Sequence, residues 1–293
     1  MISSATQLTV FTACDLVNST SNTTEEILES ITESYLAWND GGHSYPYDSC
    51  SKYNNWQRDF GSWRYPDAIC VDALDNLAVG TDVHNDSKSC GGVVRVAPIA
   101  LMGLGDNRFI DIYAMDKMAV DTARITHKNP LGYLPALVFA HVTYRLAIDD
   151  APTREKLSYY IKESLSVAAK LYPTFQQEID YLRLLLHKTL LLAYYQHPSR
   201  ESLSLLGDGW NAGEAIAMAF YCAIRYFDDF EAALAAVHHI GNRDNIGAII
   251  GNILGAAMGY NVIQEKCNPG ILSQGLECSR MIIKVADNLW ERR

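Results

Sequence analysis

Apolar residues recur at helical spacing along much of the chain, and this periodicity constrains the fold more than any other feature. Ile27, Ile31 and Tyr35 lie four residues apart, downstream of Thr23, which has a glutamate three residues later in the pattern of an N-terminal capping box. The segment 155–172 carries a second apolar stripe, with lysines and a glutamate off that stripe. No strong alternation typical of a half-buried strand appears. The sequence therefore predicts an all-α fold.

Further segments are predicted as helices: 132–147, 175–196, 211–226, 228–238 and 280–291. We expect the segment 175–196 to end before His197-Pro198, because proline cannot continue a helix. Residues 37–66 combine glycine and proline with many Tyr and Trp residues, and a long surface loop or lid is expected there. No repeat or low-complexity segment divides the chain, so one domain over residues 1–293 is predicted.

The segment 246–263 is predicted as a helix of unusual composition. Glycine occupies every fourth position, at 247, 251, 255 and 259. Each interior glycine costs about 0.5–1 kcal/mol relative to alanine, so we expect another helix or a ligand to approach this row closely. The segment is also the most apolar in the chain, but it contains Asn252 and Asn261 and is barely long enough to span a bilayer. No membrane span is therefore predicted.

Charge and cysteine content exclude further classes of protein. The 293-residue chain has a formal net charge of −10 and no run of Lys or Arg, whereas direct nucleic-acid binding needs a basic face. Its seven cysteines are dispersed without a CxxC pair, as expected of reduced thiols that are often buried. The first ten residues show no signal peptide. A cytoplasmic protein is expected, although a secreted effector without a cleavable signal has the same pattern. The oligomeric state is not predicted.

Two polar segments carry residue types that favour a binding site. The segment 87–98 leads a Ser/Gly-rich turn into an apolar helix, and free backbone N–H groups at such a junction bind anions. Arg95 adds a positive charge one turn later. The segment 207–215 contains a turn, an aromatic anchor and a helix start. There, Glu214 either favours the helix dipole or acts as a general acid–base group.

A third segment, His238–Ile249, contains one carboxylate, Asp244, near Asn242 and Asn245. Magnesium prefers hard oxygen ligands and more than one carboxylate. Arg243 also brings a positive charge beside the carboxylate, so the segment alone is a poor magnesium site. Capping of the following helix by Asp244 or Asn245 explains the pattern at least as well.

Taken together, four stretches resemble motifs of the ADP-ribosylglycohydrolase family, which includes dinitrogenase reductase-activating glycohydrolase and a crystallin. The stretches are SKSCGGVVRVAPI (87–99), THKNPLGY (126–133), GDGWNAGEA (207–215) and HIGNRDNIG (239–247). Their order and spacing match those of the family. The resemblance implies an all-α orthogonal helical bundle that hydrolyses the bond between ADP-ribose and a protein side chain with two magnesium ions.

The resemblance also implies metal-ligand positions, and the sequence departs from the family at these positions. The family's Thr-Asp-Asp motif near the N-terminus aligns with Ser3 and the two residues after it, so both carboxylates are missing. The family's last motif, Asp-x-Asp-Ser/Thr, aligns with Asn242, Asp244 and Asn245, which leaves Asp244 as a remnant. The glycine-rich segment that precedes the first motif in the family has no counterpart here.

The positions that the resemblance places beside the ligand are better matched. They are Ser89, Gly91, Gly92, Arg95, His127, Gly209 and Trp210. One carboxylate offsets little of the positive charge of two magnesium ions. We therefore expect no cofactor, with Mg²⁺ required only if the protein is active, and a large loss of hydrolytic rate. Catalytic residues are not predicted.

The leading hypothesis is a degenerate, weakly catalytic or non-catalytic family member that binds ADP-ribose or an ADP-ribosylated partner. One alternative is an active hydrolase that removes ADP-ribose from modified proteins with other carboxylates from residues 37–86, such as Asp40, Asp48 or Asp82. The other is a repurposed structural, inhibitor or immunity-type protein, for which we expect a filled cleft.

Overall fold

The computed structural model describes residues 2–19, 23–40, 64–102, 111–196, 200–266 and 277–291. The described residues form helices and no β-strand, apart from an isolated bridge between Ser89 and Asn211, which confirms the all-α prediction. The helices are α1 (Ser4–Asn18), α2 (Thr24–Asn39), α4 (Ala68–Ala78), η2 (Cys90–Gly92), α5 (Ala97–Met102), α6 (Ile112–Arg124), α7 (Pro130–Ala147), α8 (Arg154–Leu171), η3 (Pro173–Phe175), α9 (Gln176–Tyr195), α10 (Arg200–Ser204), α11 (Ala212–Arg225), α12 (Phe230–Ala235), α13 (Arg243–Met258), α14 (Tyr260–Lys266) and α16 (Ser279–Glu291).

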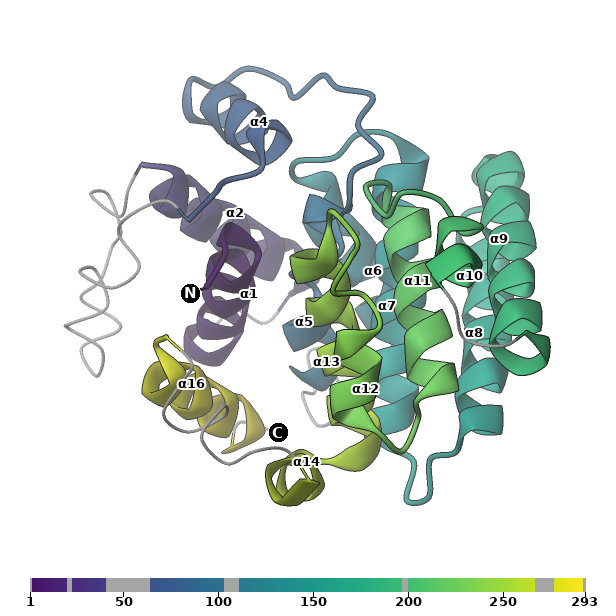
Figure 1. Cartoon of the computed structure of the whole chain (residues 1–293). Helices are drawn as coiled ribbons and strands as arrows, with labels where there is room; N and C mark the ends of the chain where they lie inside the picture. Colours follow the sequence, from purple (N-terminus) through teal and green to yellow (C-terminus); the bar gives the residue numbers. More distant parts are fainter. Residues whose placement is uncertain are drawn as a thin grey trace.

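Helix α7 organises the packing of the larger part of the molecule (Figure 1). Most of its residues are buried, as expected of a mainly apolar helix that other helices surround. Asn129 caps its N-terminus by accepting a hydrogen bond from the Leu131 amide at 2.9 Å. Pro130 occupies the first turn, where a helix needs no N–H donor. Helices α5, α6, α8, α9, α11 and α13 all pack against α7.

The N-terminal helices form a second group beside this one (Figure 1). α1 packs on α2, α5 and α16, while α2 packs on α4 and α6. Buried apolar residues from Ile2 to Leu289 belong to one continuous cluster that joins both groups. The single domain over residues 1–293 nevertheless remains a prediction.

Helix boundaries agree with most of the sequence predictions. The segments predicted as helices at 132–147, 155–172, 175–196, 211–226, 228–238 and 280–291 correspond to α7, α8, α9, α11, α12 and α16. The Thr23 hydroxyl caps α2 by accepting a hydrogen bond from the Glu26 amide at 3.2 Å. No disulfide joins the described cysteines to one another, in agreement with the prediction of reduced thiols: Cys14, Cys70, Cys90 and Cys222 are buried and Cys278 is partly exposed, while Cys50 and Cys267 lie outside the described residues.

The predicted start of the long loop at residue 37 is wrong. Helix α2 continues to Asn39 because Ala37 and Trp38 are buried against the core. The Trp38 indole N–H also donates to Gln7 Oε1 at 3.2 Å, which ties the end of α2 to α1. Residues 41–63 of the predicted loop lie outside the described residues, and residues 64–66 have no regular secondary structure, as expected.

The single helix predicted over 246–263 is also wrong. The chain bends by 108° between α13 and α14. Gly259 makes this bend with φ of 78° and ψ of 156°, a backbone conformation that is nearly exclusive to glycine. The expected close approach to the glycine row is not found either, because a Cβ at Gly251 or Gly255 would meet no described atom within 4 Å.

No single described helix is long and apolar enough to cross a membrane. The bent pair α13 and α14 passes that test by length and composition only.

The glycine row generates a matched pair of stability predictions. Gly259→Ala should lower the free energy of unfolding by about 1–3 kcal/mol, because alanine is strained at this φ and ψ. Gly251→Ala should raise it by about 0.5–1 kcal/mol, because the site is helical and has room for a methyl group. Urea unfolding of both variants measures the difference. Equal effects of the two substitutions would contradict this account of the bend.

Candidate functional site

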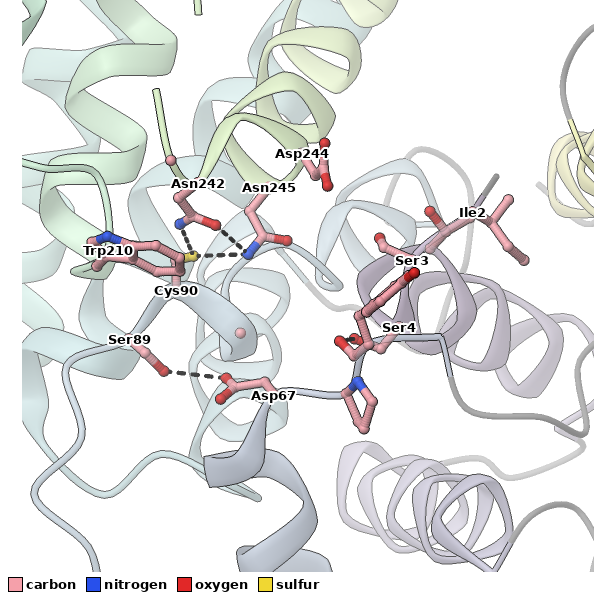
Figure 2. A pocket seen from close by; sticks show the side chains of 15 residues that line it. Ile2, Ser3, Ser4, Asp67, Ser89, Cys90, Trp210, Asn242, Asp244 and Asn245 are labelled. Atoms are coloured by element: carbon pink, nitrogen blue, oxygen red, sulfur yellow. Dashed lines mark hydrogen bonds between the residues drawn. The ribbon is translucent and has the colours of Figure 1, made fainter. Parts of the chain in front are cut away.

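A cavity of about 600 Å³ lies where the N-termini of α1, α4 and α13 come together (Figure 2). Two aromatic side chains line it and remain largely solvent-accessible: Tyr65 is 80% exposed and Trp210 is 59% exposed. Among the described lining residues, the charged ones are Asp67 and Asp244, and none is cationic. The full lining is Ile2, Ser3, Ser4, Thr6, Tyr65, Pro66, Asp67, Ser89, Cys90, Gly91, Trp210, Gly241, Asn242, Asp244 and Asn245.

The structure brings most of the predicted site residues to this one cavity. Those that line it are Ser3, Ser89, Gly91, Trp210, Asn242, Asp244 and Asn245. Four others stand behind the wall: Gly92, Arg95 and His127 are buried, and the carbonyl of Gly209 accepts a hydrogen bond from the Asn242 amide at 2.6 Å. Segments more than 200 residues apart in sequence therefore line one cavity.

A chain of hydrogen bonds leads from the buried interior to the cavity wall. Arg95 Nη2 donates to Thr126 Oγ1 at 2.7 Å, and Thr126 Oγ1 lies 2.9 Å from His127 Nδ1. On the other side of the ring, His127 Nε2 lies 2.8 Å from Ser89 Oγ. The Ser89 hydroxyl in turn donates to Asp67 Oδ2 at 3.3 Å. Asp67, whose side chain is 33% exposed, ends the chain at the cavity surface.

These contacts define the protonation state of His127. Burial, together with the positive charge of Arg95, lowers the pKa of His127 to about 3, so the ring is neutral. Every donor in the chain finds an acceptor when the Thr126 hydroxyl donates to Nδ1 and the Nε2–H donates to Ser89; this tautomer is assigned from the network. An Nε2 that carries a proton cannot take one from Ser89. The series of hydrogen bonds from Arg95 to Asp67 therefore orients Ser89 and Asp67 and does not activate the serine as a nucleophile.

Arg95 was predicted to lie beside the ligand, but it lies behind the cavity wall and is not among the residues that line the cavity. Its side chain is fully buried. The guanidinium carbon lies 4.4 Å from the Tyr35 ring centroid, Nη2 donates to the Thr122 carbonyl at 3.2 Å, and Nη1 donates to Cys70 Sγ at 3.7 Å. None of these partners is a carboxylate. The charge is instead stabilised by an aromatic face, a carbonyl, a hydroxyl and a thiol.

The two glycines of the segment 87–99, Gly91 and Gly92, allow close packing around His127. A side chain at Gly91 would collide with Asp67 Oδ2 and lie 3.3 Å from His127 Cε1. At Gly92 it would lie 3.0 Å from His127 Nδ1. Both positions therefore need glycine for the wall itself, whatever the cavity binds.

The segment 239–247 forms the opposite wall through amide groups. Asn242 and Asn245 Nδ2 approach Cys90 Sγ at 3.1 Å and 3.4 Å, and Asn245 Nδ2 also donates to Asn242 Oδ1 at 2.8 Å (Figure 2). The Gly209 carbonyl fixes the orientation of the Asn242 amide, because a flipped amide would place two oxygens against each other. Burial raises the pKa of Cys90 to about 11, so its thiol is neutral. The amide groups of this wall thus find their hydrogen-bond partners within the protein.

The residues at the family's metal positions do not fit a two-magnesium centre. Asn242 Oδ1 already accepts a hydrogen bond from Asn245. Asp244 has a side chain that is 78% exposed, lies 3.9 Å from Arg243 Nε, and points away from the two amides (Figure 2). A dinuclear magnesium site needs several carboxylates around shared ions. The expected capping by Asp244 or Asn245 is wrong as well, because α13 begins at Arg243 with Asn242 as its N-cap.

Sequence reasoning missed three lining residues that shape the site: Ser4, Asp67 and Cys90. Pro66-Asp67 before an apolar stretch is a readable N-cap signal, and Asp67 Oδ1 indeed accepts from the Ile69 amide at 3.1 Å. Its position in the cavity had no sequence signal. Of the carboxylates predicted for an active hydrolase, Asp40 and Asp82 do not line the cavity and Asp48 lies outside the described residues.

The described residues form an all-α fold with a polar cavity, and the family's last metal motif is represented there by Asn242, Asp244 and Asn245. The model of the ADP-ribosylglycohydrolase family matches residues 1–293, so the chain belongs to the ADP-ribosylglycohydrolase family. The comparison with curated proteins gave no match. The family is typically metal-dependent and acts on ADP-ribosylated substrates.

The neutral state of His127 predicts a pH dependence of stability. Its pKa is about 3 in the folded protein, below the ordinary value of 6.5, so between these values the unfolded chain binds a proton that the folded chain does not. The free energy of unfolding should therefore fall as pH drops below 6.5. Between pH of about 7.5 and about 5, the contribution of His127 is on the order of 2 kcal/mol.

Urea unfolding at both pH values tests this prediction. His127→Gln should be less stable than the natural protein at the higher pH, and this difference should shrink at the lower pH. His238→Gln, at an exposed position, is the matched control and should follow the natural protein at both. A His127→Gln variant with the full acid sensitivity of the natural protein would show that His127 is not the titrating group.

Proposed function

We propose that the protein binds the ADP-ribosyl group of a free or protein-linked ligand and does not perform the two-magnesium hydrolysis of its family. The observation that carries the proposal is the combination of an open cavity with amide groups at the metal positions. The amides of Asn242 and Asn245 are tied to Cys90 and to each other, so the wall needs no metal to satisfy its polar groups.

The lining of the cavity suits the neutral parts of such a ligand. Exposed rings at Tyr65 and Trp210 offer faces on which a base stacks. Hydroxyl groups of Ser3 and Ser4 and the amide of Asn245 match the hydrogen-bonding pattern of ribose. No cation lines the described cavity, so the pyrophosphate gains no ion pair from a side chain there. We therefore expect that added salt does not weaken binding.

A filled cleft is the feature expected of a purely structural protein, and the described residues instead leave a cavity of about 600 Å³. This observation favours the binding function over the structural alternative.

Calorimetry with ADP-ribose tests the binding function. Trp210→Ala should weaken binding by about 1–3 kcal/mol, or roughly 5- to 150-fold, because it removes the stacking face. Asp244→Asn, on the exposed rim, should change the affinity less than about threefold, since surface charges contribute little. Magnesium should have no effect on either variant. No binding at millimolar ADP-ribose would rule the proposal out in favour of a structural role.

Turnover assays separate the proposal from the active-hydrolase alternative. We expect no release of ADP-ribose from a modified protein, with or without magnesium, because the metal positions carry neutral amides. Among the described residues of the 37–86 range, Asp67 is the carboxylate that lines the cavity, so it is the residue to test. Turnover that Asp67→Asn abolishes, or that Asp244→Ala abolishes in magnesium, would replace the binding function with hydrolysis.

A further inference from the structure

Three metal-ligating groups of different chemistry meet on the inner wall of the cavity. A carboxylate oxygen of Asp67, Sγ of Cys70 and a ring nitrogen of His127 all lie within 4.8 Å of one another. Asp67 Oδ2 is 3.7 Å from Cys70 Sγ and 3.9 Å from His127 Nε2. Tetrahedral zinc sites have bonds of about 2.0–2.3 Å, which places neighbouring donor atoms about 3.3–3.8 Å apart. Small side-chain movements suffice to reach these distances.

The backbone holds these three groups in place. Asp67 is the N-cap of α4 and Cys70 lies three residues later, so both project from the same face of its first turn. His127 follows the end of α6 and is fully buried. Gly91 passes between them, where any side chain would collide with Asp67 and lie 3.2 Å from Cys70 Sγ. The absence of a side chain at this position keeps the space between the donors open.

We propose that Asp67, Cys70 and His127 form a site for a borderline-soft divalent cation such as Zn²⁺, distinct from the magnesium positions of the family. Carboxylate, thiolate and imidazole together suit zinc, whereas magnesium prefers oxygen ligands alone. Ser89 Oγ lies 2.8 Å from His127 Nε2, so it either moves aside or becomes the fourth ligand.

The surrounding hydrogen bonds adapt to the metal without leaving a donor unpaired. When Nε2 of His127 binds the cation, Nδ1 carries the proton and donates to Thr126 Oγ1, which also accepts from Arg95. The Thr126 hydroxyl is then free to donate toward Cys70 Sγ, 3.9 Å away. Metal-bound histidines usually have such a partner at the second ring nitrogen.

Cation binding releases one proton, and the charges of the site then balance. Cys70 is a neutral thiol in the metal-free protein, because burial raises its pKa to about 11. On binding, the cation replaces the thiol proton, which leaves to solvent, and an S–metal bond forms with no change of oxidation state. The Asp67 carboxylate and the Cys70 thiolate then offset the two charges of the cation. Arg95 Nη1, which donates to Cys70 Sγ, stabilises the thiolate.

Cobalt(II) titration of the metal-free full-length protein, without nucleotide, tests the site and does not depend on the proposed function. We expect one equivalent of Co²⁺ to produce a thiolate-to-cobalt charge-transfer absorption, one proton to be released, and Zn²⁺ to displace the cobalt. Cys70→Ser should abolish the absorption. Thr126→Val should weaken binding by roughly 10- to 100-fold, because it removes the group that orients His127.

Two other cysteine variants are the matched controls. Cys90→Ser and Cys278→Ser should keep the absorption, since neither thiol belongs to the cluster. Circular dichroism establishes that each variant is folded. If Cys70→Ser does not fold, Asp67→Asn replaces it and should bind cobalt at least about tenfold more weakly. A full absorption in Cys70→Ser, an unchanged affinity in Asp67→Asn, or no absorption in the folded natural protein at stoichiometric metal would overturn the proposal.

Discussion

The burial of the Arg95 guanidinium is the constraint on which the cavity wall depends. A buried cation must find several partners, and Arg95 finds them on three helical segments: the Tyr35 ring on α2, Cys70 on α4, and Thr122 and Thr126 at the end of α6. These contacts fix where α4 meets α6. Burial of the ring, together with the positive charge of Arg95, lowers the pKa of His127, so the group behind Ser89 is neutral.

That arrangement separates the shape of the site from its chemistry. The wall built by Arg95, His127 and the glycines is packed by short contacts that would form with any occupant of the cavity, including none. The opposite wall, built by Asn242 and Asn245, carries hydrogen-bonded amides at two of the family's magnesium positions. Ser3 and the two residues after it, and the asparagines of the opposite wall, depart from the family in their ligand types, whereas the wall around His127 keeps the residues of the family's motifs. A chain that belongs to a hydrolase family can therefore keep the packing of the site and still have the non-hydrolytic function that we propose.

The sequence predicted the helices whose apolar faces are regular and whose ends carry a cap or a proline, such as α8 and α9. The prediction failed where the composition was ambiguous. Trp38 lies in a stretch with the composition of a loop, but its side chain is buried. Gly259 is one of four regularly spaced glycines, and it alone among them turns the chain. The resemblance to the family implied that Ser3, Ser89 and Asn242 share a site. It did not separate contact residues from supporting ones, because the burial of Arg95 and the position of Asp67 arise from tertiary packing.

The asparagines are consistent with the proposed function, in which the cavity binds no magnesium. Several carboxylates around one cavity repel one another unless a metal ion offsets their charge. Burial raises the pKa of a carboxyl group that has no partner, or the buried charge destabilises the fold. An amide carries a donor as well as an acceptor. Asn242 Nδ2 therefore donates to the Gly209 carbonyl and to Cys90 Sγ, while Asn242 Oδ1 accepts from Asn245. Aspartate at the same position offers only acceptors and would face the Gly209 carbonyl. The exchange of carboxylates for amides therefore removes the need for a metal and stabilises the empty wall by the same hydrogen bonds.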